Sequence, residues 1–170
     1  NDADLEALLA RHRDGLLLFL FSFVRSNEDA EELLMDTFAK LAVDKPPFDP
    51  KAPGSFKSWL YAIGRNNARM FIRRKKVHTL PMREDIPSRG DFPETILLKD
   101  EKSHLLYRAM EKLKPEYRRA LTLLYFDGLS HDEIAMAMGM RKGQIYSIVK
   151  HGKETLKKTL EGMGISDAQY

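Results

Sequence analysis

Apolar residues recur every three or four positions along most of the chain, which is the spacing of one face of an α-helix. The pattern therefore predicts an all-α protein. In the first half of the chain it predicts amphipathic helices over residues 5–24, 27–44 and 55–76. In the second half it predicts helices over residues 97–113, 115–125, 130–139 and 142–160.

Two segments rich in proline interrupt these helices. Residues 45–54 contain four prolines, which oppose helix because proline lacks the backbone N–H and clashes with the preceding turn. Residues 79–95 combine three prolines with four acidic residues and are expected to form a flexible acidic linker. The prediction is two small helical domains, residues 1–78 and 96–165, joined by this linker. A chain of 170 residues is long enough for both.

Local signals mark where several helices begin and end. Ser26 is an N-cap signal, and Pro115 suits a first helical turn. Ser130 and Glu133 predict a capping box for a short helix that ends near Gly139. This short helix, a tight turn and the helix that follows have the spacing of a helix-turn-helix. The C-terminal domain is therefore predicted to be a helix-turn-helix domain.

The net charge of +3 is unevenly distributed. Residues 1–44 carry ten acidic and four basic residues, a net of −6, whereas residues 65–78 carry six basic residues and no acidic one. Such segregation suggests two faces with different partners, one acidic and one basic.

The helix predicted over residues 27–44 carries an acidic face. Its members are spaced four residues apart and share one side of the helix: Glu28, Glu32, Asp36 and Lys40. The opposite side is expected to be buried through Ala30, Leu33, Leu34, Phe38 and Leu41. The acidic face is open to three interpretations: a metal site, a partner surface or a solvated surface. A bundle metal site needs two Glu-x-x-His motifs, and the sequence supplies one, at Glu101–His104, so no metal or other cofactor is expected.

The helix predicted over residues 142–160 has features of a DNA-reading helix. Residues 141–158 hold six basic residues and one acidic residue, which favours contact with phosphates. The second helix of a helix-turn-helix presents its N-terminal residues to the major groove. Here the outward side chains would be Lys142, Gln144, Tyr146, Ser147, Lys150 and His151. A plain helical hairpin with a solvated basic face is the alternative.

The helix predicted over residues 55–76 pairs aromatic residues with a basic stripe. Its inner stripe is Phe56, Trp59, Leu60, Ile63 and Phe71, and its outer stripe is Arg65, Arg69 and Arg73. Aromatic side chains that stack on unpaired bases, beside arginines that hold phosphates, suit single-stranded DNA. Asn66 and Asn67 have the donors and acceptors that reading a base edge requires. The alternative is that the inner aromatics are ordinary core residues, and Phe48 is the aromatic expected to be free.

The sequence also excludes several classes of protein. It contains no cysteine, which rules out disulfides and thiolate zinc sites and fits a reducing cytosol. The longest apolar run, residues 16–24, is too short to span a bilayer, so no membrane insertion is expected. None of the five histidines sits in a recognisable nucleophile motif, and no enzymatic activity is expected.

Three blocks, taken in order, resemble the extracytoplasmic-function class of bacterial RNA polymerase sigma factors, within the sigma-70 family. Residues 29–41 resemble the helix that binds core polymerase, and residues 56–76 resemble the helix for the minus-10 element. Residues 113–139 resemble the C-terminal helix-turn-helix domain of this class. The resemblance runs over nearly all of residues 5–160, and the ordered set is more specific than a helix-turn-helix alone.

The resemblance implies a promoter-specificity factor that does no covalent chemistry itself. Contact with the clamp of the largest polymerase subunit would use Asp29, Glu32, Asp36 and Phe38, and the flap of the second subunit would be a further contact. Capture of an unstacked minus-10 base would use Phe48, Arg65, Asn66, Arg69 and Arg73, with Asn66 reading the base. The last helix would read the minus-35 element as duplex through its six outward residues.

The resemblance also implies an anti-sigma factor as a partner. The expected location is the cytoplasm, at the nucleoid when the protein is active or on a membrane-bound anti-sigma factor when it is held. Two alternatives remain: a helix-turn-helix regulator that acts without core polymerase, and a metal hydrolase built on the carboxylate helix. The first leaves the acidic helix and the aromatic–basic helix unexplained.

Overall fold

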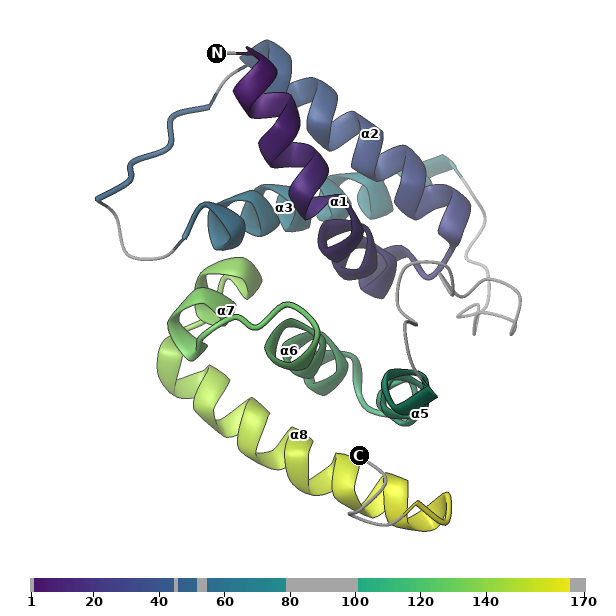
Figure 1. The fold of residues 1–170 in the computed structure, drawn as a ribbon. Coiled ribbons are helices and arrows are strands. Elements are labelled where there is room, and N and C mark those ends of the chain that lie inside the picture. Colours follow the sequence, from purple (N-terminus) through teal and green to yellow (C-terminus); the bar gives the residue numbers. More distant parts are fainter. Residues whose placement is uncertain (1, 45, 52–54, 79–100, 166–170) are drawn as a thin grey trace. The chain divides into compact units, whose positions relative to one another are not determined.

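The computed structural model describes residues 2–44, 46–51, 55–78 and 101–165. Within these ranges it contains helices and no strand (Figure 1): α1 (Asp2–Val24), α2 (Asn27–Asp44), α3 (Phe56–His78), α5 (Glu101–Met110), α6 (Pro115–Tyr125), α7 (His131–Met138) and α8 (Lys142–Gly162). The predicted all-α class is confirmed. The predicted linker at residues 79–95, and the first residues of the helix predicted over 97–113, lie outside the described residues.

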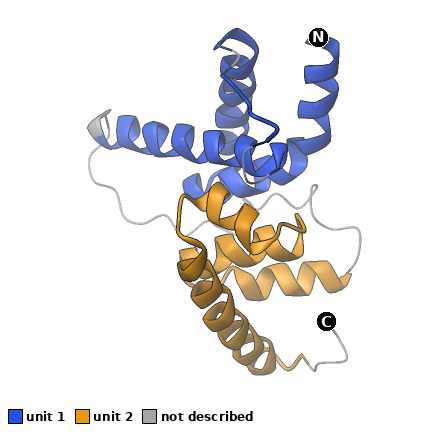
Figure 2. Ribbon diagram, turned by 90° about the vertical axis from the view of Figure 1, so that its left-hand side faces the viewer, with its two compact units in different colours: residues 1–93 blue, residues 94–170 orange. Residues whose placement is uncertain are grey.

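The chain divides into two compact units, residues 1–93 and 94–170 (Figure 2). The first unit contains α1, α2 and α3, and the second contains α5 to α8. No helix in the described ranges carries a stretch that is both long and apolar enough to traverse a lipid bilayer.

In the first unit, α1 packs against both α2 and α3. The ring of Phe19 on α1 stacks on Tyr61 of α3, with centroids 5.3 Å apart and planes 14° apart. Residues 16–21 are all buried, so the amphipathic pattern of α1 is confined to the part of the helix before this apolar run. The reason is that these six residues include no polar side chain, and a helix that is apolar on every side is buried.

The second helix begins and buries its apolar side largely as predicted. The Oγ of Ser26 accepts a hydrogen bond from the N–H of Asp29 at 3.3 Å, which confirms the N-cap signal. The buried residues of α2 are Ala30, Leu33, Leu34, Thr37 and Leu41. Phe38 is only half-buried, because Thr37 occupies the core-facing position next to it.

The second unit contains the predicted helix-turn-helix. Ser130 and Glu133 form the predicted capping box, in which the Ser130 N–H donates to Glu133 Oε1 at 3.1 Å and the Glu133 N–H donates to Ser130 Oγ at 3.2 Å. Gly139 ends α7 with a φ of 65°, a left-handed conformation that glycine adopts without a Cβ clash. The α8 helix then packs on α5, α6 and α7 through Ile145, Val149, Gly152, Leu156 and Leu160.

Candidate nucleic-acid interface

The basic stripe of α3 lies at the surface of the first unit. Arg69 and Arg73 are exposed, whereas Arg65 is half-buried. Burial lowers the pKa of Arg65, and the positive charge of Arg69 lowers it further. Arginine has so high an ordinary pKa that Arg65 keeps its charge at neutral pH. The stripe is therefore a concentrated positive surface, part of it desolvated, which suits contact with phosphates.

The two adjacent asparagines of α3 have different surroundings. Asn66 is exposed, and its Oδ1 accepts a hydrogen bond from Nη2 of Arg65 at 3.3 Å. Asn67 is buried, and its Nδ2 donates to Oγ1 of Thr37 on α2 at 3.2 Å. Asn67 therefore joins two helices within the core. Of the two amides considered for reading a base, only Asn66 faces solvent.

The aromatic side chains at the start of α3 form a cluster with the preceding loop. The ring of Phe48 lies 5.5 Å from that of Phe56 and 5.2 Å from that of Trp59, measured between centroids. Phe56 also lies 5.8 Å from the ring of His12 on α1. Phe48 is the most exposed ring of this cluster, but it is not isolated as expected, because the loop folds back onto the first turn of α3. Phe48 keeps 38% of its surface exposed, so the outer side of the cluster remains accessible.

The acidic face of α2 is exposed at Glu28, Glu32, Asp36 and Lys40. Asp29 lies off this face and belongs to a contact between helices, because its Oδ2 pairs with Nζ of Lys75 on α3 at 2.5 Å. Met35 lies beside Asp36 and is 64% exposed, so this side of α2 also presents an apolar side chain. In the described part of the chain, no three His, Asp or Glu side chains are grouped so that they could hold a metal ion.

All six residues predicted to point outward from α8 are exposed: Lys142, Gln144, Tyr146, Ser147, Lys150 and His151. Two of them, Gln144 and His151, have polar contacts close by in the chain, at the start of α8 and within it. Oε1 of Gln144 accepts a hydrogen bond from the N–H of Arg141 at 3.0 Å, so this side chain caps its own helix. Nδ1 of His151 lies 3.6 Å from a carboxylate oxygen of Glu154.

Two residues at the start of α7, to which sequence reasoning gave no role in binding, contact outward side chains of α8. The ring of His131 stacks on the ring of Tyr146, with centroids 4.3 Å apart and planes 12° apart. Oδ1 of Asp132 lies 3.1 Å from Nζ of Lys142. The signal available in the sequence was the capping box, which places residues 131 and 132 in the first turn of α7, where the chain enters the helix-turn-helix.

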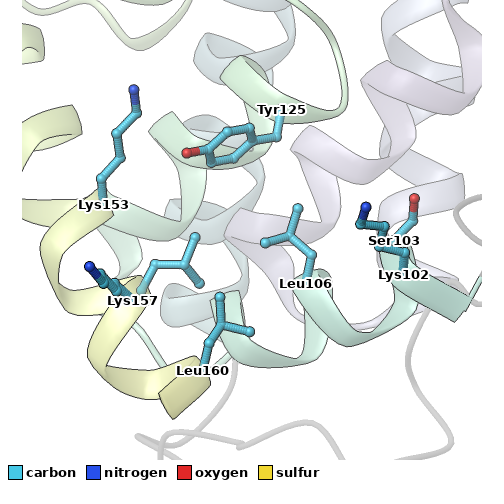
Figure 3. Close-up of a pocket in the computed structure, with 8 residues that line it drawn as sticks. Lys102, Ser103, Leu106, Tyr125, Lys153, Lys157 and Leu160 are labelled. Atoms are coloured by element: carbon cyan, nitrogen blue, oxygen red, sulfur yellow. The ribbon is translucent and has the colours of Figure 1, made fainter. Parts of the chain in front are cut away.

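A groove of about 380 Å³ lies on the second unit, between α5, α6 and α8 (Figure 3). Its apolar part is formed by Leu106, Leu156 and Leu160, and the remaining lining residues are Lys102, Ser103, Tyr125, Lys153 and Lys157. Burial raises the pKa of the Tyr125 hydroxyl, which therefore stays neutral at the edge of the groove. An apolar surface edged by three lysines suits a partner with apolar and acidic side chains.

By fold, the chain is an all-α protein with a helix-turn-helix unit. Two family models match it: "Sigma-70 region 2" over residues 8–77 and "Sigma-70, region 4" over residues 103–156. Among curated relatives, the ECF RNA polymerase sigma factor SigE of Mycolicibacterium smegmatis is 27% identical over 168 residues, which are 96% of this chain and 64% of that protein. The RNA polymerase sigma factor CarQ of Myxococcus xanthus is 30% identical over 156 residues, covering 91% of this chain and 88% of that protein.

Solved structures give the same fold. The sigma factor RpoE, in complex with the anti-sigma factor NepR from Bartonella quintana, has a TM-score of 0.66 and 23% identity, over 93% of this chain and 97% of that one. The chain belongs to the extracytoplasmic-function class of RNA polymerase sigma factors in the sigma-70 family. Sigma factors are not an enzyme family. The resemblance inferred from sequence is confirmed.

Proposed function

We propose that this protein binds core bacterial RNA polymerase, directs it to specific promoters and helps to open the minus-10 region. The observation that carries the proposal is that each of the two units presents a helix with exposed basic and polar side chains, α3 in the first and α8 in the second. In the first unit α3 places arginines beside an exposed amide and an aromatic cluster, which suits an opened strand. In the second unit α8 presents polar and basic side chains from a helix-turn-helix, which suits the major groove of a duplex.

In the first unit, which holds the proposed domain of residues 1–78, α3 would capture an unstacked base of the minus-10 element. Arg65, Arg69 and Arg73 would hold the phosphates, and Asn66 would hydrogen-bond the base edge. Phe48 would act from within the cluster with Trp59, by offering its exposed side to the base. The proposal is supported by the exposure of Asn66 and by its contact with Arg65, which directs the amide toward the basic stripe.

In the second unit, which holds the proposed domain of residues 96–165, α8 would read the minus-35 element as duplex. Tyr146, Ser147 and Lys150 are exposed and not occupied in capping the helix, so we assign base contacts to them first. Gln144 and His151 would contribute after giving up a local contact. Lys142 would contact the backbone phosphates near the start of the helix. The segment of residues 79–95 would connect the two domains within the polymerase.

Core polymerase would contact both units. The exposed carboxylates Glu32 and Asp36, with Met35 beside them and Phe38 half-buried nearby, would dock on the clamp of the largest subunit. Asp29 would support this surface indirectly, because its pairing with Lys75 holds α2 against α3. An interface of charged residues around an apolar contact is typical of specific association.

We assign the groove of the second unit to the flap of the second polymerase subunit. Its apolar lining and lysine edge call for a helix with apolar and acidic side chains. Lys157→Glu should weaken binding of the full chain to core polymerase about threefold to tenfold, in line with about 1 kcal/mol for an edge charge. Lys158→Glu is the matched control, since Lys158 is exposed on the same helix and does not line the groove. Equal effects of the two changes would remove the groove from the interface.

An anti-sigma factor is a further proposed partner. The proposal is supported by the likeness of the fold to RpoE, whose structure is that of a complex with the anti-sigma factor NepR. Such a partner would hold the protein away from polymerase, in the cytoplasm or at a membrane.

The test of the proposed function is run-off transcription with the purified chain, core bacterial RNA polymerase and a pool of promoters from the host. The expected result is initiation that depends on the chain and occurs at a defined promoter set. A regulator that acts without polymerase would instead bind duplex DNA by itself and would neither co-elute with core polymerase nor support initiation. That outcome would overturn the proposal.

A further inference from the structure

The N-terminus of α7 holds two exposed side chains of α8 in place. His131, the first residue of α7, stacks on Tyr146 with ring centroids 4.3 Å apart. The next residue, Asp132, pairs with Lys142 at 3.1 Å. Lys142 and Tyr146 are four residues apart and share one side of α8. Two consecutive residues of one helix therefore restrain two neighbouring residues of the proposed DNA-reading helix.

The contacts form a closed set, which we call the α7–α8 cluster: His131, Asp132, Lys142 and Tyr146. Nζ of Lys142 lies 5.7 Å from the centroid of the Tyr146 ring, within the range of a cation–π contact. The hydrogen bond from Lys142 to Asp132 raises the pKa of this lysine. The ammonium group of Lys142 therefore lies near both the carboxylate of Asp132 and the ring of Tyr146.

The α7–α8 cluster is not part of the core that holds the helix-turn-helix together. The core between α7 and α8 is provided by fully buried residues such as Ile134 and Ile145. Tyr146, in contrast, is 52% exposed. A ring stacked outside the core adds little to the packing of the helices. The main consequence of the stacking is that the ring of Tyr146 and its hydroxyl group are held in one orientation.

We propose that His131 is a positioning residue that holds Tyr146 for readout of a thymine-containing base pair in the upstream promoter element. This inference rests on the proposed function of α8 as the duplex-reading helix. A tyrosine ring edge suits apolar contact with the thymine methyl group in the major groove. A side chain ordered before binding loses less conformational entropy on binding, so its contact contributes more to affinity.

Asp132 complements this role. Its carboxylate partly neutralises Lys142 at the start of α8, which weakens the attraction of this lysine for phosphates of any sequence. Affinity at this end of the helix therefore depends more on base contacts and less on the DNA backbone. The cluster as a whole favours sequence preference over general DNA affinity.

The experiment uses holoenzyme assembled from the full chain and core bacterial RNA polymerase. It measures run-off transcripts from a promoter library randomised across the upstream element, for the wild type, His131→Ala, His131→Phe, Tyr146→Ala and the His131→Ala/Tyr146→Ala double variant. His131→Phe keeps a ring that can stack on Tyr146. If His131→Ala folds poorly, this variant still tests whether the stacking contact sets the base preference. Affinity for a duplex of unrelated sequence is measured in parallel.

For His131→Ala we expect the preference for thymine at one base pair to fall about threefold to tenfold, the amount that ordering one side chain is worth. His131→Phe should retain the preference, and affinity for unrelated duplex should stay unchanged. Tyr146→Ala should lose the same preference, and the double variant should lose no more. Non-additivity of this kind shows that the two residues act through one contact.

Two results would overturn this inference and leave the proposed function of α8 intact. The first is an unchanged base preference in His131→Ala. The second is an equal loss of affinity for promoter and unrelated duplex in both His131 variants, which would make His131 a phosphate contact. If wild-type holoenzyme shows no preference anywhere in the randomised element, the proposed role of α8 fails first and the inference fails with it.

Discussion

The two units support their proposed DNA-contacting helices in different ways. On α3 the exposed and the structural side chains alternate along the same turns, since exposed Asn66 is followed by Asn67, which is buried and bonded to Thr37. On α8 the buried residues and the exposed residues lie on separate faces, and two of the exposed ones, Lys142 and Tyr146, contact the start of α7. On α8 the residues proposed to bind DNA are therefore distinct from those that pack in the core, whereas on α3 the two kinds of residue are adjacent in sequence.

The effect of a substitution is therefore easier to predict from the sequence on α8 than on α3. On α8 the helical period alone tells which side chains are available to a partner. On α3 a one-residue change of position moves a substitution from the surface to the core. Effects on stability and on promoter function should therefore diverge between neighbouring residues in the first unit.

The largest effect is expected from Asp36→Arg on α2, in the first unit. This side chain is exposed and has no role in packing, so the change should leave the melting temperature unchanged. Reversing the charge at a complementary interface should weaken binding of the full chain to core polymerase about tenfold or more. Glu6→Arg is the matched control, because Glu6 is an exposed acid on α1, outside the acidic face. Full binding by Asp36→Arg, measured by competition for core polymerase, would exclude this face from the interface.

The two asparagines provide the sharpest comparison within α3. Asn66→Ala should reduce promoter opening about tenfold, as expected for a base contact of 1–3 kcal/mol, with unchanged stability. Asn67→Ala should lower the free energy of unfolding of the first unit by about 1–2 kcal/mol, because it removes a buried hydrogen bond to Thr37. Permanganate reactivity of the opened strand and urea denaturation separate the two effects. A stability loss in Asn66→Ala equal to that in Asn67→Ala would contradict the comparison.

Two glycines extend the comparison to packing. A Cβ at Gly64 of α3 would lie 2.9 Å from Cδ1 of Leu16 and 3.3 Å from Cδ2 of Leu20, and both leucines are fully buried. Gly64→Ala should therefore destabilise the first unit by about 1–3 kcal/mol through overpacking. A Cβ at Gly143 of α8 would meet nothing within 4 Å, so Gly143→Ala should stabilise the second unit by up to about 1 kcal/mol. Urea denaturation should show the two transitions moving in opposite directions.

The smallest effect concerns His12 on α1. Burial lowers the pKa of His12 below its ordinary value of 6.5, and the charges of Lys57 and Arg11 lower it further. The folded unit therefore prefers the neutral imidazole. The stability due to His12 is complete above pH 6.5 and decreases as the pH falls from there toward the lowered pKa. Melting temperatures from pH 7 to pH 5 should fall less for His12→Gln than for the wild type, and equal slopes would exclude His12 as the cause.

Helix positions were largely predictable because they depend on local periodicity and on short-range hydrogen bonds. The helices predicted over residues 55–76 and 142–160 correspond to Phe56–His78 and Lys142–Gly162. The Ser130–Glu133 capping box and the cap at Ser26 also followed, since each joins residues three apart in the chain. The family was indicated separately, by the resemblance of three ordered sequence blocks to the motifs of sigma factors.

The surroundings of individual site residues were less predictable. Phe48 lies against Phe56 and Trp59, and Asp29 is paired with Lys75, although nothing near either residue in the sequence indicates its neighbour. Gln144 points outward as predicted, yet it caps its own helix. His131 was recognised only as the beginning of α7. Its contact with Tyr146 depends on the angle at which the two helices meet.

The sequence by itself determined the all-α class and the helix-turn-helix, because helical period, caps and turns are encoded within a few consecutive residues. It also indicated the sigma factor family, through the resemblance of residues 29–41, 56–76 and 113–139 to the motifs of that family. Only the tertiary structure decided which of two adjacent amides faces solvent and which outward side chains are restrained. These properties depend on contacts between segments far apart in the chain, such as the 30 residues that separate Thr37 from Asn67. A pattern of apolar and polar positions places a side chain on a face of its helix, whereas the packing of the other helices determines what that face meets.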